Sequence, residues 1–412
     1  MTPRTTGTAT AGEGPARVRI HGLDALRGSA LLLGILLHSL MPFAPEMPWL
    51  VVDDRSSPLA FAGVYVIHLF RMTLFMLLAG YLGRMVLVRR GPRSYFRDRV
   101  VRILLPLFAF WPVSVFSLGV IATVAAGTGT GGTPAPPPID APLVLLVFTP
   151  GQLWFLLVLF EIIVLVLVAR AVLLRVLGPE RAGRWSARIG GALSHPAGVL
   201  LAAVPYAAAL LLQGGDPAQG IMAPPTVLPE AAPLVGYLGA FLAGWFLHAA
   251  PDALGRMAPR WPLLLAPAVL GTVFMVLPVA AGLPAAAGAG VVALTGLLWT
   301  YGLTAFMVKV FSREHAVVRY LADASYWMYL MHLPLLVAIE VPLAGLEWPI
   351  MAKLLLTWTV TTALLLGGYQ LLVRRTALGR WLNGTRRRSG PRADAPGAPA
   401  RSGGDGAPAA GP

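Results

Sequence analysis

The sequence predicts an all-α, polytopic membrane protein of about ten transmembrane helices. Of the 412 residues, 57% are hydrophobic and only 12% are charged, and the mean hydropathy is +0.72. Soluble domains carry about a quarter of charged residues. Apolar stretches of about 20 residues, the length that spans a bilayer, recur along the chain. Arg and Lys gather in alternate connections between these stretches, as in inner-membrane proteins.

Ten stretches are long and apolar enough to span a bilayer. Gly and Pro inside several of them are tolerated, because neighbouring helices can satisfy the freed backbone groups. No internal repeat of 20–50 residues is visible, so one membrane domain over residues 20–375 is predicted. The stretches cover residues 23–42, 60–83, 101–126, 152–176, 195–213, 231–249, 262–281, 286–310, 326–346 and 350–373.

Basic and non-basic connections alternate along the whole chain. The connection after residue 83 holds seven Arg, whereas the one around residue 140 holds a single Asp and no cation. The positive-inside rule then places both termini in the cytoplasm and requires an even number of spans. This pattern also explains the net charge of +14 without a nucleic-acid partner.

The two ends are predicted to be disordered and cytoplasmic. Residues 1–19 are small and polar and lack the apolar region of a signal peptide, and residues 376–412 are basic and rich in Pro, Gly and Ala. The absence of Cys excludes disulfides and thiolate metal sites, and no metal is expected. No P-loop, dinucleotide fingerprint or HExxH motif is present.

The first span carries Arg27 and His38, eleven residues apart. Eleven helical steps bring the two side chains to the same face, about 16 Å apart along the axis. One interpretation is a functional face with a cation near the cytoplasm and a base further out. The alternative is that Arg27 extends to the membrane surface while His38 bonds a neighbouring helix.

The second span carries His68 and Arg71 near its middle, one turn apart. A charge at this depth costs about 2.5–3.5 kcal/mol, so Arg71 needs an anionic partner. Glu161, in the stretch 152–176, is the best internal candidate. Either Arg71 and Glu161 form a structural pair, or Arg71 binds substrate while Glu161 orients His38 or His68.

Arg99 and Arg102 lie one turn apart at a cytoplasmic boundary, where they are either ordinary positive-inside residues or a clamp for phosphates. Tyr329 and His332 share one stripe of the stretch 326–346, facing either a neighbouring helix or a cavity. Trp154, at the outer end of 152–176, is an interface residue or a platform for a sugar.

Taken together, the order and spacing of these motifs over residues 20–375 resemble the membrane acyltransferase-3 family, within it the branch that includes glucan biosynthesis protein C. Arg27 and His38 match its Arg-x10-His motif, and Arg99 and Arg102 match its Arg-x2-Arg motif. The phrases FRMTLFMLLAGYLG, LWFL, GWFLH and SYWMYLMH also look like family phrases. Gln152 departs from the His that many members have there.

The resemblance implies ten core helices and an acyltransferase for groups other than aminoacyl groups. The acyl group, such as acetyl or succinyl, would pass from cytoplasmic acyl-CoA to a hydroxyl of a glycan or glycosylated acceptor. For the named branch, the assigned role is O-succinylation of periplasmic glucan. The protein would be multi-pass in the bacterial inner membrane, with acyl-CoA, the acceptor and the lipid bilayer as partners; a homo-oligomer is left open.

In the mechanism that follows, His38 acts as general base on the acceptor hydroxyl, and a covalent acyl-histidine relay is the open alternative. Glu161 orients the imidazole, and Arg71 or His68 stabilises the oxyanion. The remaining candidates bind substrates: Arg27, Arg99 and Arg102 the donor phosphates, and Trp154, Tyr329 and His332 the acceptor.

A different class of function is a transporter or flippase for a glycan or lipid-linked substrate. Its buried Arg, Glu and His would line the substrate or proton pathway. The absence of an inverted repeat and the family resemblance both argue against it. A membrane scaffold is a third reading, and it leaves the cost of burying Arg71 and Glu161 unexplained unless they pair.

Overall fold

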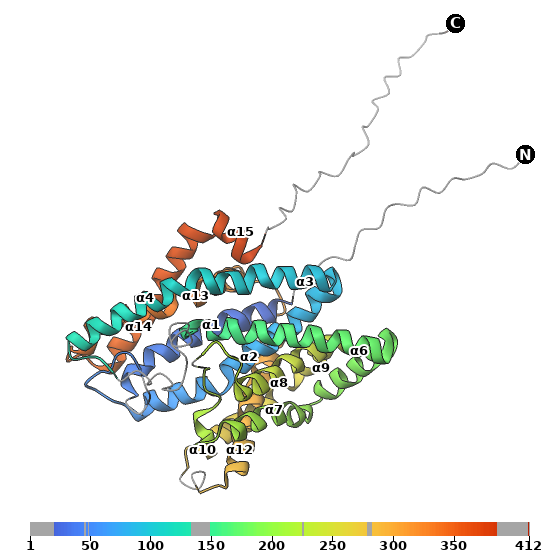
Figure 1. Ribbon diagram of the computed structural model, residues 1–412, viewed down its shortest axis with the longest axis horizontal. Helices are drawn as coiled ribbons and strands as arrows, with labels where there is room; N and C mark the ends of the chain where they lie inside the picture. Colours follow the sequence, from blue (N-terminus) through green and yellow to red (C-terminus); the bar gives the residue numbers. More distant parts are fainter. Residues whose placement is uncertain are drawn as a thin grey trace, which may run out of the picture.

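The computed structural model describes residues 20–44, 47, 49–132, 149–224, 226–277, 282–384 and 411. Within these residues the protein is nearly all helical, and the only extended pairing described is an isolated bridge between Val51 and Gly131. The long helices form one bundle (Figure 1). The all-α polytopic prediction is therefore confirmed. The residues 1–19, predicted to be disordered, and the single Asp of the connection around residue 140 lie outside the described residues.

The bundle is built from long helices joined by short ones. Two π-helical turns interrupt it, at Val100–Leu104 and at Tyr369–Val373. The helices are α1 His21–Leu40, α2 Pro58–Arg90, α3 Pro92–Arg99, α4 Leu105–Gly127, α6 Trp154–Leu193, α7 Gly198–Gln213, α8 Ala231–Ala249, α9 Ala253–Met257, α10 Trp261–Met275, α12 Ala285–Val310, α13 Ala316–Ala344, α14 Ile350–Gly368 and α15 Ala377–Asn383.

Nine helical segments of the described chain are long and apolar enough to cross a membrane, one fewer than the ten predicted. The exception is the stretch 195–213, which forms α7, Gly198–Gln213. Its 16 residues rise by roughly 24 Å, less than the ~30 Å hydrocarbon core of a bilayer. The cytoplasmic placement of both termini depends on an even number of spans and therefore stays a prediction.

The helical part of the chain also continues beyond the predicted boundary at residue 375. Residues Ala377–Asn383, assigned from composition to a disordered tail, form α15. Thr376 caps this helix through a hydrogen bond from the backbone N–H of Gly379, and the side chain of Leu382 is buried. Burial against the bundle stabilises a helix too short to persist alone. The tail beyond Gly384 lies outside the described residues, apart from Gly411.

Close packing of α2 against α8 fixes the helix that carries Arg71. A Cβ added at Gly80 of α2 would overlap with the carbonyl of Phe241, and one added at Gly244 of α8 would overlap with that of Leu77. Reciprocal glycines let two backbones approach closely, as is common between membrane helices. On its other sides α2 contacts α1 and α12, while α1 also contacts α13 and α14.

Candidate active site

A cavity of about 310 Å³ lies among α1, α2, α13 and the start of α6. Its walls bring together side chains that are far apart in sequence, and six of the ten predicted site residues are among them. Those six are Arg27, His38, Arg71, Trp154, Tyr329 and His332.

The wall formed by α1 follows the helical period. Arg27, Leu31, Gly34 and His38 all line the cavity, at spacings of four, three and four residues. Side chains at these spacings lie above one another on one face of a helix. The eleven-residue interval between Arg27 and His38 therefore does place both on one face, with the cation nearly two turns after the start of α1 and the imidazole near its far end.

Arg71 reaches the cavity from α2 because the facing position on α1 has no side chain. A Cβ added at Gly34 would lie 2.5 Å from Nη1 of Arg71. No carboxylate of the described residues forms an ion pair with this guanidinium, and its Nε is buried without a hydrogen-bond partner. A buried cation in this state is suited to bind an anion that the protein does not supply.

Glu161 does not form the predicted pair with Arg71, and its predicted role in orienting an imidazole stays a prediction. It forms no ion pair with Arg71 among the described residues, and it does not line the cavity. The reason is its depth along α6, because the adjacent Phe160 packs against Phe96 of α3, with ring centroids 6.1 Å apart. Glu161 is therefore level with α3, two turns beyond Trp154.

His68 also lies outside the cavity lining. Its ring packs beside the backbone of the segment that precedes α8, where a Cβ added at Gly220 would lie 3.0 Å from Cδ2. His68 and Arg71 both come from α2 and are one helical turn apart. Only Arg71 lines the cavity.

His38 is held between two rings. The indole of Trp49 lies parallel to its imidazole, with centroids 5.2 Å apart and planes 10° apart, and the imidazole of His332 lies 5.4 Å away. Trp49 is in turn fixed by a hydrogen bond from its Nε1 to Oε2 of Glu340, 3.2 Å long. Nδ1 of His38 is buried without a hydrogen-bond partner among the described residues.

His332 has a defined tautomer. Its Nδ1 lies 2.7 Å from the carbonyl oxygen of Tyr329. A carbonyl oxygen can only accept, so Nδ1 carries the hydrogen and Nε2 is left as an acceptor. The hydroxyl of Tyr329 donates to the carbonyl of Gln152, and Nε2 of Gln152 donates to the carbonyl of Leu330. These bonds join the short helical turn Gly151–Leu153, directly before α6, to the middle of α13.

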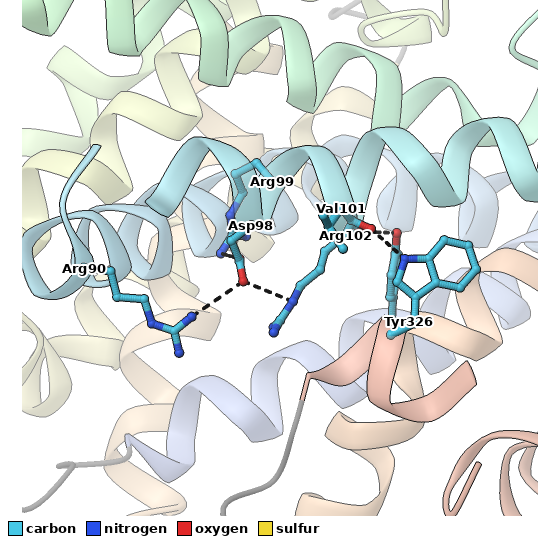
Figure 2. A network of polar contacts seen from close by, with 7 residues as sticks. Arg90, Asp98, Arg99, Val101, Arg102 and Tyr326 are labelled. Atoms are coloured by element: carbon cyan, nitrogen blue, oxygen red, sulfur yellow. Dashed lines mark hydrogen bonds and ion pairs between the residues drawn. The ribbon is translucent and has the colours of Figure 1, made fainter. Parts of the chain in front are cut away.

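Arg99 and Arg102 form a separate cluster at the junction of α3 and α4 (Figure 2). The carboxylate of Asp98 lies 2.9 Å from Arg99, 3.1 Å from Arg102 and 3.6 Å from Arg90. The cluster adjoins the cavity at Tyr326, which lines the cavity while its hydroxyl donates to the carbonyl of Arg102.

The sequence reasoning missed Trp49, Glu340 and a buried ion pair. Nζ of Lys353 lies 2.5 Å from Oδ2 of Asp53, and both side chains are almost fully buried. A second cavity, just large enough for one water at about 10 Å³, lies between this pair and Glu340. Glu340 and Lys353 are charged residues within predicted spans, a signal that could have identified them.

Comparison with known proteins identifies the family of the chain. A model of the acyltransferase-3 family, described as an acyltransferase domain, matches residues 20–371, which include every residue of the cavity wall. Neither the curated proteins nor the solved structures contain a match.

Proposed function

Since the chain belongs to the acyltransferase-3 family, we propose that it is an integral-membrane O-acyltransferase that uses cytoplasmic acyl-CoA to acylate a hydroxyl of a glycan or glycosylated acceptor. The observation that carries the proposal is the shared cavity, into which α1 and α13 bring two imidazoles and α2 brings an arginine without an acidic partner among the described residues. A base and an oxyanion stabiliser are the groups that acyl transfer to a hydroxyl requires.

In the proposed reaction, His38 takes the proton of the acceptor hydroxyl, whose oxygen then attacks the thioester carbonyl. Arg71 stabilises the negative charge that develops on the carbonyl oxygen, an effect that is strengthened where water is excluded. When the tetrahedral intermediate collapses, the C–S bond breaks and the CoA sulfur takes the proton from the imidazolium. The acyl group then remains on the acceptor oxygen.

His332 supports this chemistry from the other side of His38. Its Nδ1–H is committed to the carbonyl of Tyr329, so its Nε2 can accept a hydrogen bond from a hydroxyl bound between the two rings. With Trp154 and Tyr329 it would orient the acceptor. Glu340 acts on His38 indirectly, because it accepts the hydrogen bond that fixes Trp49, and Trp49 stacks on His38.

The donor would approach from the arginine cluster. Acyl-CoA carries its negative charge on phosphates, which Arg binds through paired N–H groups. The phosphates would bind at Arg99 and Arg102, and Arg27 would lie along the path of the arm. By helix rise, Arg27 and His38 are about 16 Å apart, a distance that the pantetheine arm can cover.

The proposal extends to the location and the acyl group. The protein would be a multi-pass protein of the bacterial inner membrane with the arginine cluster on the cytoplasmic side, which agrees with the positive-inside rule. The resemblance to the branch of glucan biosynthesis protein C makes succinyl and acetyl the first acyl groups to test.

The test is incubation of the purified protein, in lipid nanodiscs, with a panel of radiolabelled acyl-CoAs and a cell-envelope extract. We expect label to pass to a glycan or glycolipid with release of one CoA per acyl group. His38→Ala should abolish transfer at unchanged expression. Retained activity in that variant would exclude His38 as the base. Transport of an acceptor into liposomes without consumption of acyl-CoA would instead support a carrier.

A further inference from the structure

The π-helical turn at Val100–Leu104 is followed by Pro106, which has no N–H to donate to the carbonyl of Arg102, four residues earlier, or to that of Val101, five residues earlier. One backbone donor is therefore missing beside these two carbonyls, and both accept hydrogen bonds from side chains of other helices. The hydroxyl of Tyr326 on α13 donates to the carbonyl of Arg102 at 2.6 Å, and Nε1 of Trp381 on α15 donates to that of Val101 at 2.8 Å.

This turn carries part of a strongly cationic cluster (Figure 2). Within the part of the chain that the structure describes, Asp98 is the carboxylate that pairs with Arg90, Arg99 and Arg102, so these four side chains together carry an excess of two positive charges. The side chains of Arg99 and Arg102 are 23% and 32% exposed, whereas Asp98 is 11% exposed. Asp98 therefore orients guanidinium groups that still have N–H groups free for an anion.

Helix α15 ends on this cluster. Gly384 follows the helix with φ +81°, and a Cβ at this position would overlap with the guanidinium of Arg102. Nδ2 of Asn383 donates to the carbonyl of Asp323 on α13, which ties the end of α15 to the bundle. The segment that includes α15 therefore contacts the region of Arg102 twice. Trp381 bonds to the carbonyl of the preceding residue, Val101, and Gly384 lies against the guanidinium of Arg102.

We infer that α15 is a clamp that sets the affinity of the arginine cluster for the phosphates of the CoA donor. Trp381 and Gly384 are its positioning residues, since they hold the turn and the guanidinium of Arg102 without a role in the acyl chemistry. This inference rests on the proposed function. It predicts that changes in α15 alter binding of the phosphate-bearing part of the donor and leave the pantetheine part unaffected.

The inference is tested by calorimetric titration of the full-length protein in nanodiscs with CoA and, separately, with pantetheine, which lacks the phosphates. Trp381→Phe removes the indole N–H but keeps a ring, and Gly384→Ala displaces Arg102. We expect the Kd for CoA to rise about fivefold in Trp381→Phe, the effect of one lost neutral hydrogen bond, and further in Gly384→Ala. The Kd for pantetheine should not change.

Two matched variants separate this effect from general perturbation. Trp185→Phe alters an exposed indole elsewhere on the protein. Gly214→Ala imposes the same kind of backbone strain, since Gly214 also follows a helix, with φ +72°, but has nothing within 4 Å of an added Cβ. Neither should change the Kd for CoA.

Three results would overturn the clamp. Unchanged CoA affinity in both α15 variants would do so while leaving the proposed function intact. Equal losses for CoA and pantetheine would mean that α15 supports the whole fold instead of the phosphate site. Absence of CoA binding to the wild-type protein would overturn both the clamp and the proposed donor.

Discussion

The indole of Trp49 lies flat on the imidazole of His38, with planes 10° apart. His38 is near the end of α1, and Trp49 is in the connection that follows, between α1 and α2. Nε1 of Trp49 donates to Glu340 on α13. One face of His38 is therefore covered by a ring that α13 holds in place.

Trp49 and Glu340 should act as a unit. Trp49→Phe keeps a stacked ring but loses the hydrogen bond, and Glu340→Ala loses the acceptor of the same bond. Each single change should lower kcat about five- to tenfold, because His38 loses its support at a cost of about 1 kcal/mol. The double variant should be no worse than the poorer single variant. Steady-state kinetics of the four proteins would check this, and strictly additive losses would contradict it.

Gly34 should be required for the position of Arg71. A Cβ there would lie 2.5 Å from Nη1, so Gly34→Ala must move the guanidinium away from the cavity. We expect kcat to fall by about two orders of magnitude, as for loss of one oxyanion donor. Gly290→Ala is the control, because nothing lies within 4 Å of an added Cβ at that position. Equal activity of the two variants would argue against a role of Arg71 in the reaction.

The buried pair Lys353–Asp53 should stabilise the connection that carries Trp49. Lys353→Met leaves the carboxylate of Asp53 buried without its cation, which costs about 3–5 kcal/mol in the free energy of unfolding. The double variant Asp53→Asn with Lys353→Met removes both charges and should recover most of this loss. Thermal unfolding in detergent, followed by Trp fluorescence, gives the comparison. A double variant less stable than Lys353→Met would contradict the expectation.

Arg102 should affect donor binding and not the chemical step. Arg102→Ala removes a charged hydrogen-bond donor to phosphate, a loss of about 1.5–3 kcal/mol, so the KM for acyl-CoA should rise about 10- to 150-fold at unchanged kcat. Arg188→Ala is a suitable control, since Arg188 stacks on the exposed Trp185 near the end of α6. An unchanged KM in Arg102→Ala would reject the phosphate role.

Much of the fold followed from the sequence because a membrane constrains helices locally. A spanning helix must be apolar over its own length and must satisfy its own backbone. Nine of the ten predicted spans are matched by helices long enough to cross a membrane. The exception is the stretch 195–213, which hydropathy alone marked as a span but which forms α7 with only 16 residues. The disorder predicted from composition also missed α15, because that helix depends on burial against α13 and the π-helical turn.

The site followed from the sequence only in part. Periodicity within α1 places Arg27 and His38 on one wall, and the depth of Arg71 marks it as a residue that needs an anion. Of the two alternatives for Arg71, the pair with Glu161 does not form, because Glu161 lies deeper along α6, next to the ring that packs against α3. Trp49 could not be identified at all, since nothing in the connection before α2 distinguishes it.

The sequence by itself determined which segments are helices in the membrane, and which side chains share a face of one helix, because both depend on residues close along the chain. Only the tertiary structure decided which faces meet: that Gly34 makes room for Arg71, that His332 reaches His38, and that Trp381 closes the turn beside Arg102. Those contacts depend on the rotation and depth of each helix against its neighbours, which packing between backbones sets and hydropathy does not encode.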